Sequence, residues 1–169
     1  NPRVQLAAQL HGGGHERGRR SGTLYPPQIV GFARAIELAL QAMPTESIRL
    51  ARLRDDLWDR LKTCGDAQLN GHPTQRLPGN LNVSFAGIDG QALLLGLRSI
   101  AAVSSGAACS SASTAPSHVL KALGLSDELA YASLRFGIGR PNTFEDIEQV
   151  ATGVLDTVNA LRQVSPSAR

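Results

Sequence analysis

One cysteine lies in a segment whose composition suits nucleophilic chemistry. Apart from Cys109 itself, the run from Val103 to Ala115 holds only valine, serine, glycine, alanine and threonine. Such small neighbours bury little surface and order poorly, whereas a structural cysteine is normally packed among large apolar side chains. An accessible thiol that ionises is a soft nucleophile. The residues fit equally well a tight turn in which Cys109 has no chemical role.

Two other stretches suit the binding of anions. Arg135 alternates with Leu134 and Phe136, so a strand there places the guanidinium opposite the apolar face, where it can pair with a carboxylate. Residues 11–23 contain five glycines in thirteen positions, and a loop of this kind offers backbone amides to a phosphate. The alternatives are a surface arginine on an edge strand and an ordinary turn before a helix.

The remaining histidines and the second cysteine predict no site. His11 and His15 have the spacing of a metal pair, but the three glycines between them remove the helical register that would align the rings. His118 is expected to pack or hydrogen-bond on its own helix. Cys64 follows an amphipathic helix, which favours a structural role. We therefore predict no metal site from these residues.

The composition of the 169 residues limits the class of protein. Hydrophobic residues make up 42% and charged residues 18%, which is typical of a globular domain. The net charge is only +3 and aromatics are 4%, which disfavours a nucleic-acid surface. The two cysteines lie 45 positions apart without a CxxC pair, so no disulfide framework is expected. With no long apolar run, the sequence predicts a cytoplasmic protein without membrane contact.

The order of predicted elements is that of an α/β protein. From residue 66 to 169, strands at 81–85, 100–103 and 134–138 alternate with helices that begin near Asp89, Pro116 and Thr143. Residues 26–65 predict connecting helices, the first of them ended or kinked at Pro44. Residues 1–25 do not share the core pattern and are expected to be the end of another domain, which carries the glycine-rich loop.

Four motifs resemble those of one family, in the family's order. The stretch Ser104–Ser113 followed by Pro116–Gly124 closely resembles the active-site segment of cysteine desulfurases, in particular the long-loop group that serves iron–sulfur cluster assembly. The resemblance continues at three further places: Ser133–Arg140, His11–Leu24 and Asn80–Phe85. It spans nearly the whole chain.

The resemblance implies a fold and a set of roles. The chain would be the C-terminal part of a class V aminotransferase, a fold type I pyridoxal-phosphate enzyme: its small domain, the connecting helices and the end of its large domain. Cys109 would take sulfur from L-cysteine as a persulfide and leave L-alanine. Arg135 would bind the substrate carboxylate, and Thr23 with Arg20 would bind the cofactor phosphate of the partner in a homodimer.

The cofactor lysine of such enzymes is expected upstream of residue 1, because neither Lys62 nor Lys121 lies in a matching motif. The resemblance also implies a sulfur acceptor such as an iron–sulfur scaffold protein, and Cys109 as a transient iron–sulfur ligand. Two alternatives stay open: a catalytically inactive binding half, or another class V aminotransferase. The second alternative leaves the segment around Cys109 unexplained.

Overall fold

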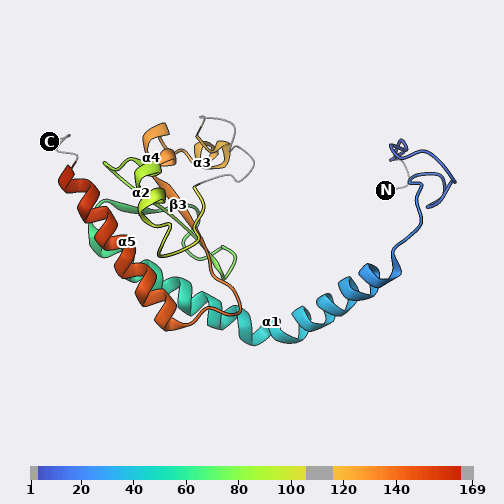
Figure 1. The fold of residues 1–169 in the computed structure, drawn as a ribbon, viewed down its shortest axis with the longest axis horizontal. Coiled ribbons are helices and arrows are strands. Elements are labelled where there is room, and N and C mark those ends of the chain that lie inside the picture. Colours follow the sequence, from blue (N-terminus) through green and yellow to red (C-terminus); the bar gives the residue numbers. More distant parts are fainter. Residues whose placement is uncertain (1–3, 106–115, 165–169) are drawn as a thin grey trace. The chain divides into compact units, whose positions relative to one another are not determined.

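The computed structural model describes residues 4–105 and 116–164. It divides into two compact units, Asn1–Met43 and Pro44–Arg169, and each unit is described by itself. Helix α1 (Pro26–Leu61) belongs to both, with Pro44 inside it (Figure 1). The prediction of a second, separate helix after Pro44 is therefore wrong, because one helix continues through the proline.

The first unit has no core of its own. None of its described residues is buried, and its large apolar side chains are exposed on both the loop and the helix. On the helix these are Ile29, Val30, Phe32, Ile36, Leu38, Leu40 and Met43. Apolar surface on this scale marks a region that contacts another protein surface. No helix in the described part of the chain is long and apolar enough to cross a bilayer.

The second unit is built on a three-stranded antiparallel sheet in the order β1-β2-β3. The strands are β1 (Ala67–Leu69), β2 (Asn80–Phe85) and β3 (Ser133–Gly137). β2 and β3 agree with the predicted strands, and their register places Leu81 opposite Phe136 and Val83 opposite Leu134. The strand predicted at residues 100–103 is wrong, because Ser104 forms only an isolated bridge with Arg135.

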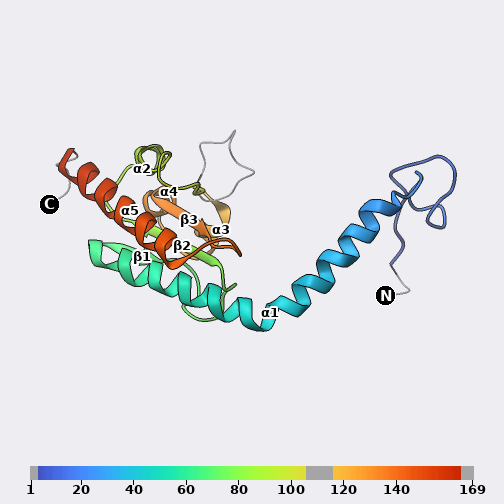
Figure 2. The same ribbon diagram turned by 60° about the horizontal axis from the view of Figure 1, so that its bottom comes forward.

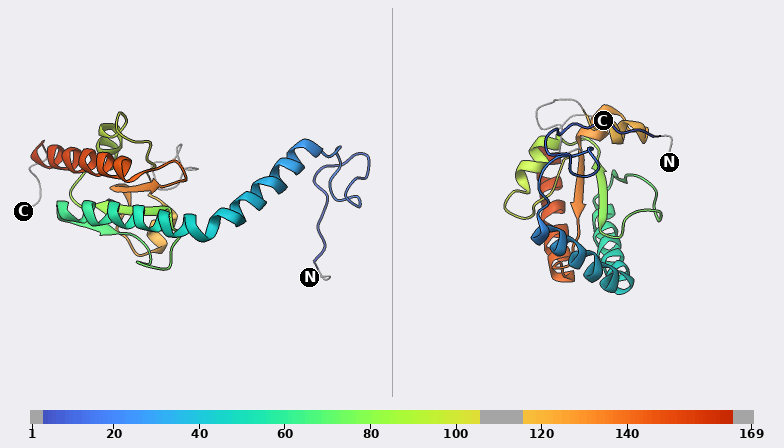
Figure 3. Two further views of the ribbon diagram at one scale, coloured as in Figure 1. Left: turned by 90° about the horizontal axis from the view of Figure 1, so that it is seen from below. Right: turned by 90° about the vertical axis from the view of Figure 1, so that its right-hand side faces the viewer.

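One face of this sheet carries the main core. Leu81, Val83 and Phe85 of β2 pack with the second part of α1 and with α5 (Phe144–Val164). Figures 2 and 3 show these two helices side by side over the same face, and Arg60 of α1 forms an ion pair of 3.6 Å with Glu148 of α5. Fully burying one leucine contributes about 1.5–3 kcal/mol to stability. This apolar layer fixes which residues of β2 and β3 face the other way.

The opposite face is polar and lies toward two short helices, α3 (His118–Ala122) and α4 (Asp127–Tyr131). They share a small apolar cluster of Leu120, Leu125 and Ala130. The predicted end of α3 is confirmed, since Gly124 follows it with a φ of +88° that favours glycine.

Local hydrogen bonds confirm the helix starts predicted near Asp89 and Thr143. Asp89 accepts the Ala92 amide at 2.7 Å and caps α2 (Gly90–Gly96). Before α5, Thr143 Oγ1 accepts the Asp146 amide at 3.2 Å, and Asp146 accepts the Thr143 amide at 2.9 Å. This reciprocal pair is a capping box.

Candidate functional site

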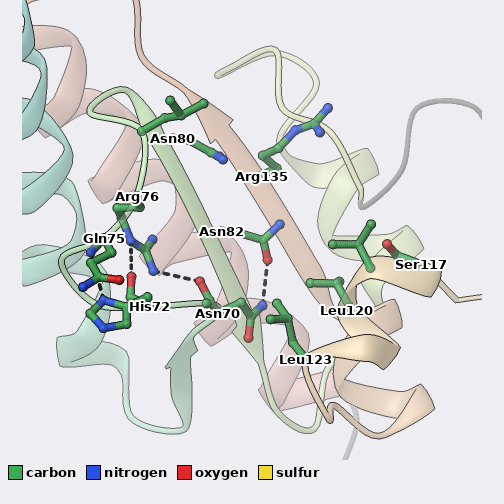
Figure 4. Close-up of a pocket in the computed structure, with 13 residues that line it drawn as sticks. Asn70, His72, Gln75, Arg76, Asn80, Asn82, Ser117, Leu120, Leu123 and Arg135 are labelled. Atoms are coloured by element: carbon green, nitrogen blue, oxygen red, sulfur yellow. Dashed lines mark hydrogen bonds between the residues drawn. The ribbon is translucent and has the colours of Figure 1, made fainter. Parts of the chain in front are cut away.

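A pocket of about 360 Å³ opens on the polar face of the sheet. It is lined by residues of β2, β3, α3 and the connection before β2, and Figure 4 shows their side chains. Asn82 and Arg135 come from the strands, and Ser117 and Leu120 from the start of α3. The pocket therefore combines a cation, amides and an apolar wall, as expected for a small polar ligand.

The backbone of Arg135 is held by two hydrogen bonds to Ser104. Its guanidinium has no carboxylate partner in the described ranges. Its amide donates to Ser104 O at 2.7 Å, and the Ser104 amide donates back at 3.2 Å. The side chain is exposed, and its Nη2 lies 3.4 Å from Ser104 Oγ. A guanidinium in this state can bind an incoming carboxylate through two parallel hydrogen bonds.

The described residues on the two sides of the segment that contains Cys109 are connected to this pocket in different ways. Ser104, five positions before the cysteine, is bonded to Arg135, and Ser117, eight positions after it, is buried in the pocket wall. Cys109 itself lies outside the described residues. The structure thus places one flanking residue in contact with the predicted carboxylate-binding arginine and the other in the wall of the same pocket.

A buried polar network underlies the pocket, and the sequence did not predict it. Asn70 Nδ2 donates to Asn82 Oδ1 at 2.7 Å and lies 2.8 Å from Ser84 Oγ and 3.3 Å from Ser133 Oγ. Ser133 Oγ donates to Leu129 O at 2.7 Å. All buried polar side-chain atoms in the described part have partners. A satisfied network of this kind holds the polar face rigid.

The far side of the pocket carries a second arginine that is already engaged. Arg76 donates to His72 O at 2.7 Å and to Asn70 O at 2.8 Å. Burial, and then the neighbouring charge of Arg54, lower the pKa of this guanidinium from its ordinary value. Arg76 therefore fixes the backbone of Asn70, whereas Arg135 keeps its donors available.

The glycine-rich loop of the first unit contains tight turns, and several of its backbone amides are hydrogen-bonded within the loop. Gly14, Glu16, Arg17 and Gly18 all have positive φ values, and Gly22 donates its amide to His15 Nδ1 at 3.3 Å. Thr23 is exposed, and its hydroxyl has no partner among the described residues. Arg20 is also exposed, and only its bond to Gly22 O, at 3.3 Å, is observed. Thr23 and Arg20 belong to the first unit and Arg135 to the second.

The donor set therefore fits the phosphate end of a pyridoxal-phosphate cofactor but not its attachment to a lysine. Lys62 is paired with Asp59 at 2.5 Å, and Lys121 is paired with Asp127. Both lysine side chains are about half exposed, at 53% and 44%. An amine that forms a covalent bond to the cofactor is instead presented in a pocket. Neither lysine has this environment.

We expect the chain on its own to form no stable covalent adduct with pyridoxal phosphate, because both amines are solvated and ion-paired. After mixing and dialysis, absorbance above roughly 400 nm, where a lysine-bound cofactor absorbs, should be absent. A full-length cysteine desulfurase treated identically is the positive control. A yellow adduct of one cofactor per chain after dialysis would contradict this expectation.

Cys64 lies in the short helix η1 (Lys62–Cys64) and packs against the main core. Burial raises the pKa of its thiol, and the nearby Arg162 only partly offsets this. Arg162 also donates to the carbonyls of Cys64 and Gly65. These contacts agree with the structural role that the sequence predicts for this cysteine.

We therefore expect iodoacetamide at neutral pH to label Cys109 at least ~10-fold faster than Cys64, because alkylation requires the thiolate. Since the Cys64 pKa is raised, its labelling should accelerate as the pH increases toward the folded-state pKa. Mass mapping of peptides after brief treatment at several pH values measures both rates. Equal labelling of the two thiols at neutral pH would show that Cys109 is not the reactive one.

Comparison with known proteins identifies the family. The family described as aminotransferase class V matches residues 4–150, and the chain belongs to it. The cysteine desulfurase IscS of Acinetobacter baumannii (strain AYE) is 54% identical over 166 residues, which is 98% of this chain. The cysteine desulfurase IscS of Aeromonas hydrophila is 52% identical over 165 residues, again 98% of this chain.

A solved structure extends the likeness to the fold. The NifS-like protein from Rickettsia africae matches with a TM-score of 0.80 at 28% identity, over 92% of this chain and 41% of that chain. The chain likewise spans 41% of the length of both desulfurase relatives. The predicted resemblance and the predicted α/β fold, matching part of such proteins, are confirmed.

Proposed function

We propose that this chain carries the sulfur-accepting part of a cysteine desulfurase, which converts L-cysteine to L-alanine and leaves an enzyme persulfide on Cys109. One observation supports this most strongly: of the residues that flank the segment with Cys109, Ser104 is bonded to Arg135 and Ser117 lines the pocket that contains Arg135. A nucleophile tethered beside a carboxylate-binding arginine suits attack on an amino acid.

Each residue has a defined task in the proposed reaction. Arg135 binds the α-carboxylate and so sets the position of the substrate sulfur. The Cys109 thiolate attacks that sulfur, the carbon–sulfur bond breaks, and a proton is added to the carbon, which gives alanine and the persulfide. Pyridoxal phosphate supplies the withdrawal of electrons from the substrate that makes this bond labile. Thr23 and Arg20 hold the phosphate of the cofactor bound by the partner subunit.

The proposed partners follow from the exposed surfaces and the family. The apolar side chains of the first unit suit contact with a large cofactor domain and a second subunit in a homodimer. In this proposal residues 1–25 are the end of the large domain, and residues 66–169 form the small domain. Residues 26–65 are the helical connection between the two domains. A cytoplasmic iron–sulfur scaffold is the proposed acceptor, toward which Cys109 would also act as a transient cluster ligand.

The proposal is tested in a full-length chimera, made by joining the part of the A. baumannii relative that precedes the aligned region to residues 4–169 of this chain. With pyridoxal phosphate bound, the chimera should convert L-cysteine to equal amounts of L-alanine and transferable sulfur. A chimera that binds the cofactor but transaminates amino acids without releasing sulfur would favour an aminotransferase. A chimera that binds the cofactor but neither desulfurates L-cysteine nor transaminates amino acids would favour the alternative of an inactive binding half.

A further inference from the structure

Asn82 lies directly opposite Arg135 in the sheet. The two are Cα partners in the antiparallel pair of β2 and β3, and both face the pocket. Side chains directly opposite each other in such a pair are close neighbours, with Cβ atoms about 4.5–5.5 Å apart. A small ligand bound by one of them is therefore within reach of the other.

The orientation of the Asn82 side-chain amide is fixed by a hydrogen bond from the buried Asn70. Asn70 is only 5% exposed, and its Nδ2 donates to Asn82 Oδ1 at 2.7 Å. Asn70 is itself anchored, because its backbone amide donates to Asn82 O at 2.9 Å and its carbonyl accepts from Arg76. Figure 4 shows the result: the Asn82 oxygen points to Asn70, and its nitrogen lies on the side of Arg135.

This arrangement leaves the Asn82 amide nitrogen without an acceptor, opposite a guanidinium whose observed side-chain contact is that of Nη2 with Ser104 Oγ at 3.4 Å. Within the described ranges no oxygen accepts from Asn82 Nδ2, and no carboxylate pairs with Arg135. Asn82 is half-buried at the pocket wall, whereas Asn80, two positions earlier on the same face, is exposed and opposite Gly137. An amide N–H group on the residue opposite a carboxylate-binding arginine can supply one more donor to that carboxylate.

We propose that Asn82 is a substrate-binding residue, whose Nδ2, held in place by Asn70, donates to the α-carboxylate of L-cysteine beside Arg135. The role deepens the proposed desulfurase function and depends on it. The two hydrogen bonds from Arg135 use one lone pair of each carboxylate oxygen, which leaves another for Asn82 Nδ2. A further, rigidly held donor narrows the position of the carboxylate and thereby the direction in which the sulfur points toward Cys109.

The test is the KM for L-cysteine in the full-length chimera. Asn82→Ala removes the donor, and we expect the KM to rise about 10-fold while kcat changes by no more than about two-fold. Asn82→Asp keeps the acceptor for Asn70 but turns a negative charge toward the substrate, so the KM should rise about 100-fold or more. A purely structural role predicts the reverse order, since the aspartate preserves the bond to Asn70.

The matched control is Gln68→Ala, an exposed polar residue of the neighbouring strand β1 that does not line the pocket, which should leave the KM within about two-fold. Thermal unfolding and cofactor absorbance check that each variant is folded. If Asn82→Ala does not fold, Asn82→Asp carries the test. An unchanged KM in the folded variant, or an aspartate variant closer to wild type than the alanine variant, would overturn the role of Asn82. A wild-type chimera that makes no alanine would instead refute the proposed function itself.

Discussion

Cys109→Ser in the full-length chimera is expected to lower alanine and sulfide production from L-cysteine by at least ~1000-fold, because a hydroxyl is a far poorer nucleophile toward sulfur than a thiolate. Cofactor binding should be unchanged, since the residues proposed to hold the phosphate, Thr23 and Arg20, belong to the other unit of the chain. Alanine is measured by amino-acid analysis and sulfur by release with a reductant.

The matched control is the other thiol. Cys64→Ser should keep most of the activity, because Cys64 packs against the core and burial raises its pKa, which disfavours the thiolate. If the Cys109→Ser chimera retained normal alanine production, Cys109 would not be the nucleophile. A serine variant that lost the cofactor as well would point to a structural effect rather than a chemical one.

Arg135→Ala is expected to lower kcat/KM for L-cysteine by about 30- to 1000-fold, which corresponds to roughly 2–4 kcal/mol for a lost bidentate contact between charged groups. The main change should be in KM, because the guanidinium binds the carboxylate before and during the reaction. Since Arg135 forms no ion pair within the described ranges, its removal should cost the fold little. Steady-state kinetics and thermal unfolding separate the two effects.

Two further variants sharpen this test. Arg135→Lys keeps the charge but loses the fork geometry, so its kcat/KM should fall between the values of wild type and Arg135→Ala. Arg98→Ala removes an exposed arginine from the same unit, away from the pocket, and should have no effect. An equal loss in both alanine variants would mean that general charge, and not carboxylate binding at Arg135, determines the kinetics.

The sequence predicted the two strands that alternate strictly, β2 and β3, and missed the short strand β1. Leu81, Val83 and Phe85 alternate with polar residues because one face of β2 meets the core, and this pattern is readable locally. β1 has only three residues, too few to establish a period. The apolar run 100–103 instead begins in a turn, with the Ile100 and Ala101 amides both donating to Leu97 O, and continues without regular secondary structure.

Helix α1 was misjudged at Pro44 because its stability is not local. The proline removes one backbone donor, but the following leucines, Leu53, Leu57 and Leu61, are fully buried against the sheet. This burial stabilises the part of the helix that follows the proline. A rule based on the proline alone cannot take it into account.

The candidate site, too, contains one part that the sequence pattern predicts and one part that it does not. The strand pattern predicted which face carries Arg135, and the same pattern places Asn82 on that face. The contact of Asn82 with Asn70 depends on a pairing twelve positions away, and the one between Asn70 and Ser133 on a pairing of 63 positions. Such non-local contacts leave no periodic signal in a single sequence.

The most direct measurement of the central claim is the mass of the Cys109 peptide after the cofactor-loaded chimera has reacted with L-cysteine. We predict a gain of one sulfur atom on Cys109, none on Cys64, and loss of that gain on treatment with a thiol reductant, with alanine formed in equal amount. Alanine formation with an unmodified Cys109 at all reaction times would contradict the account.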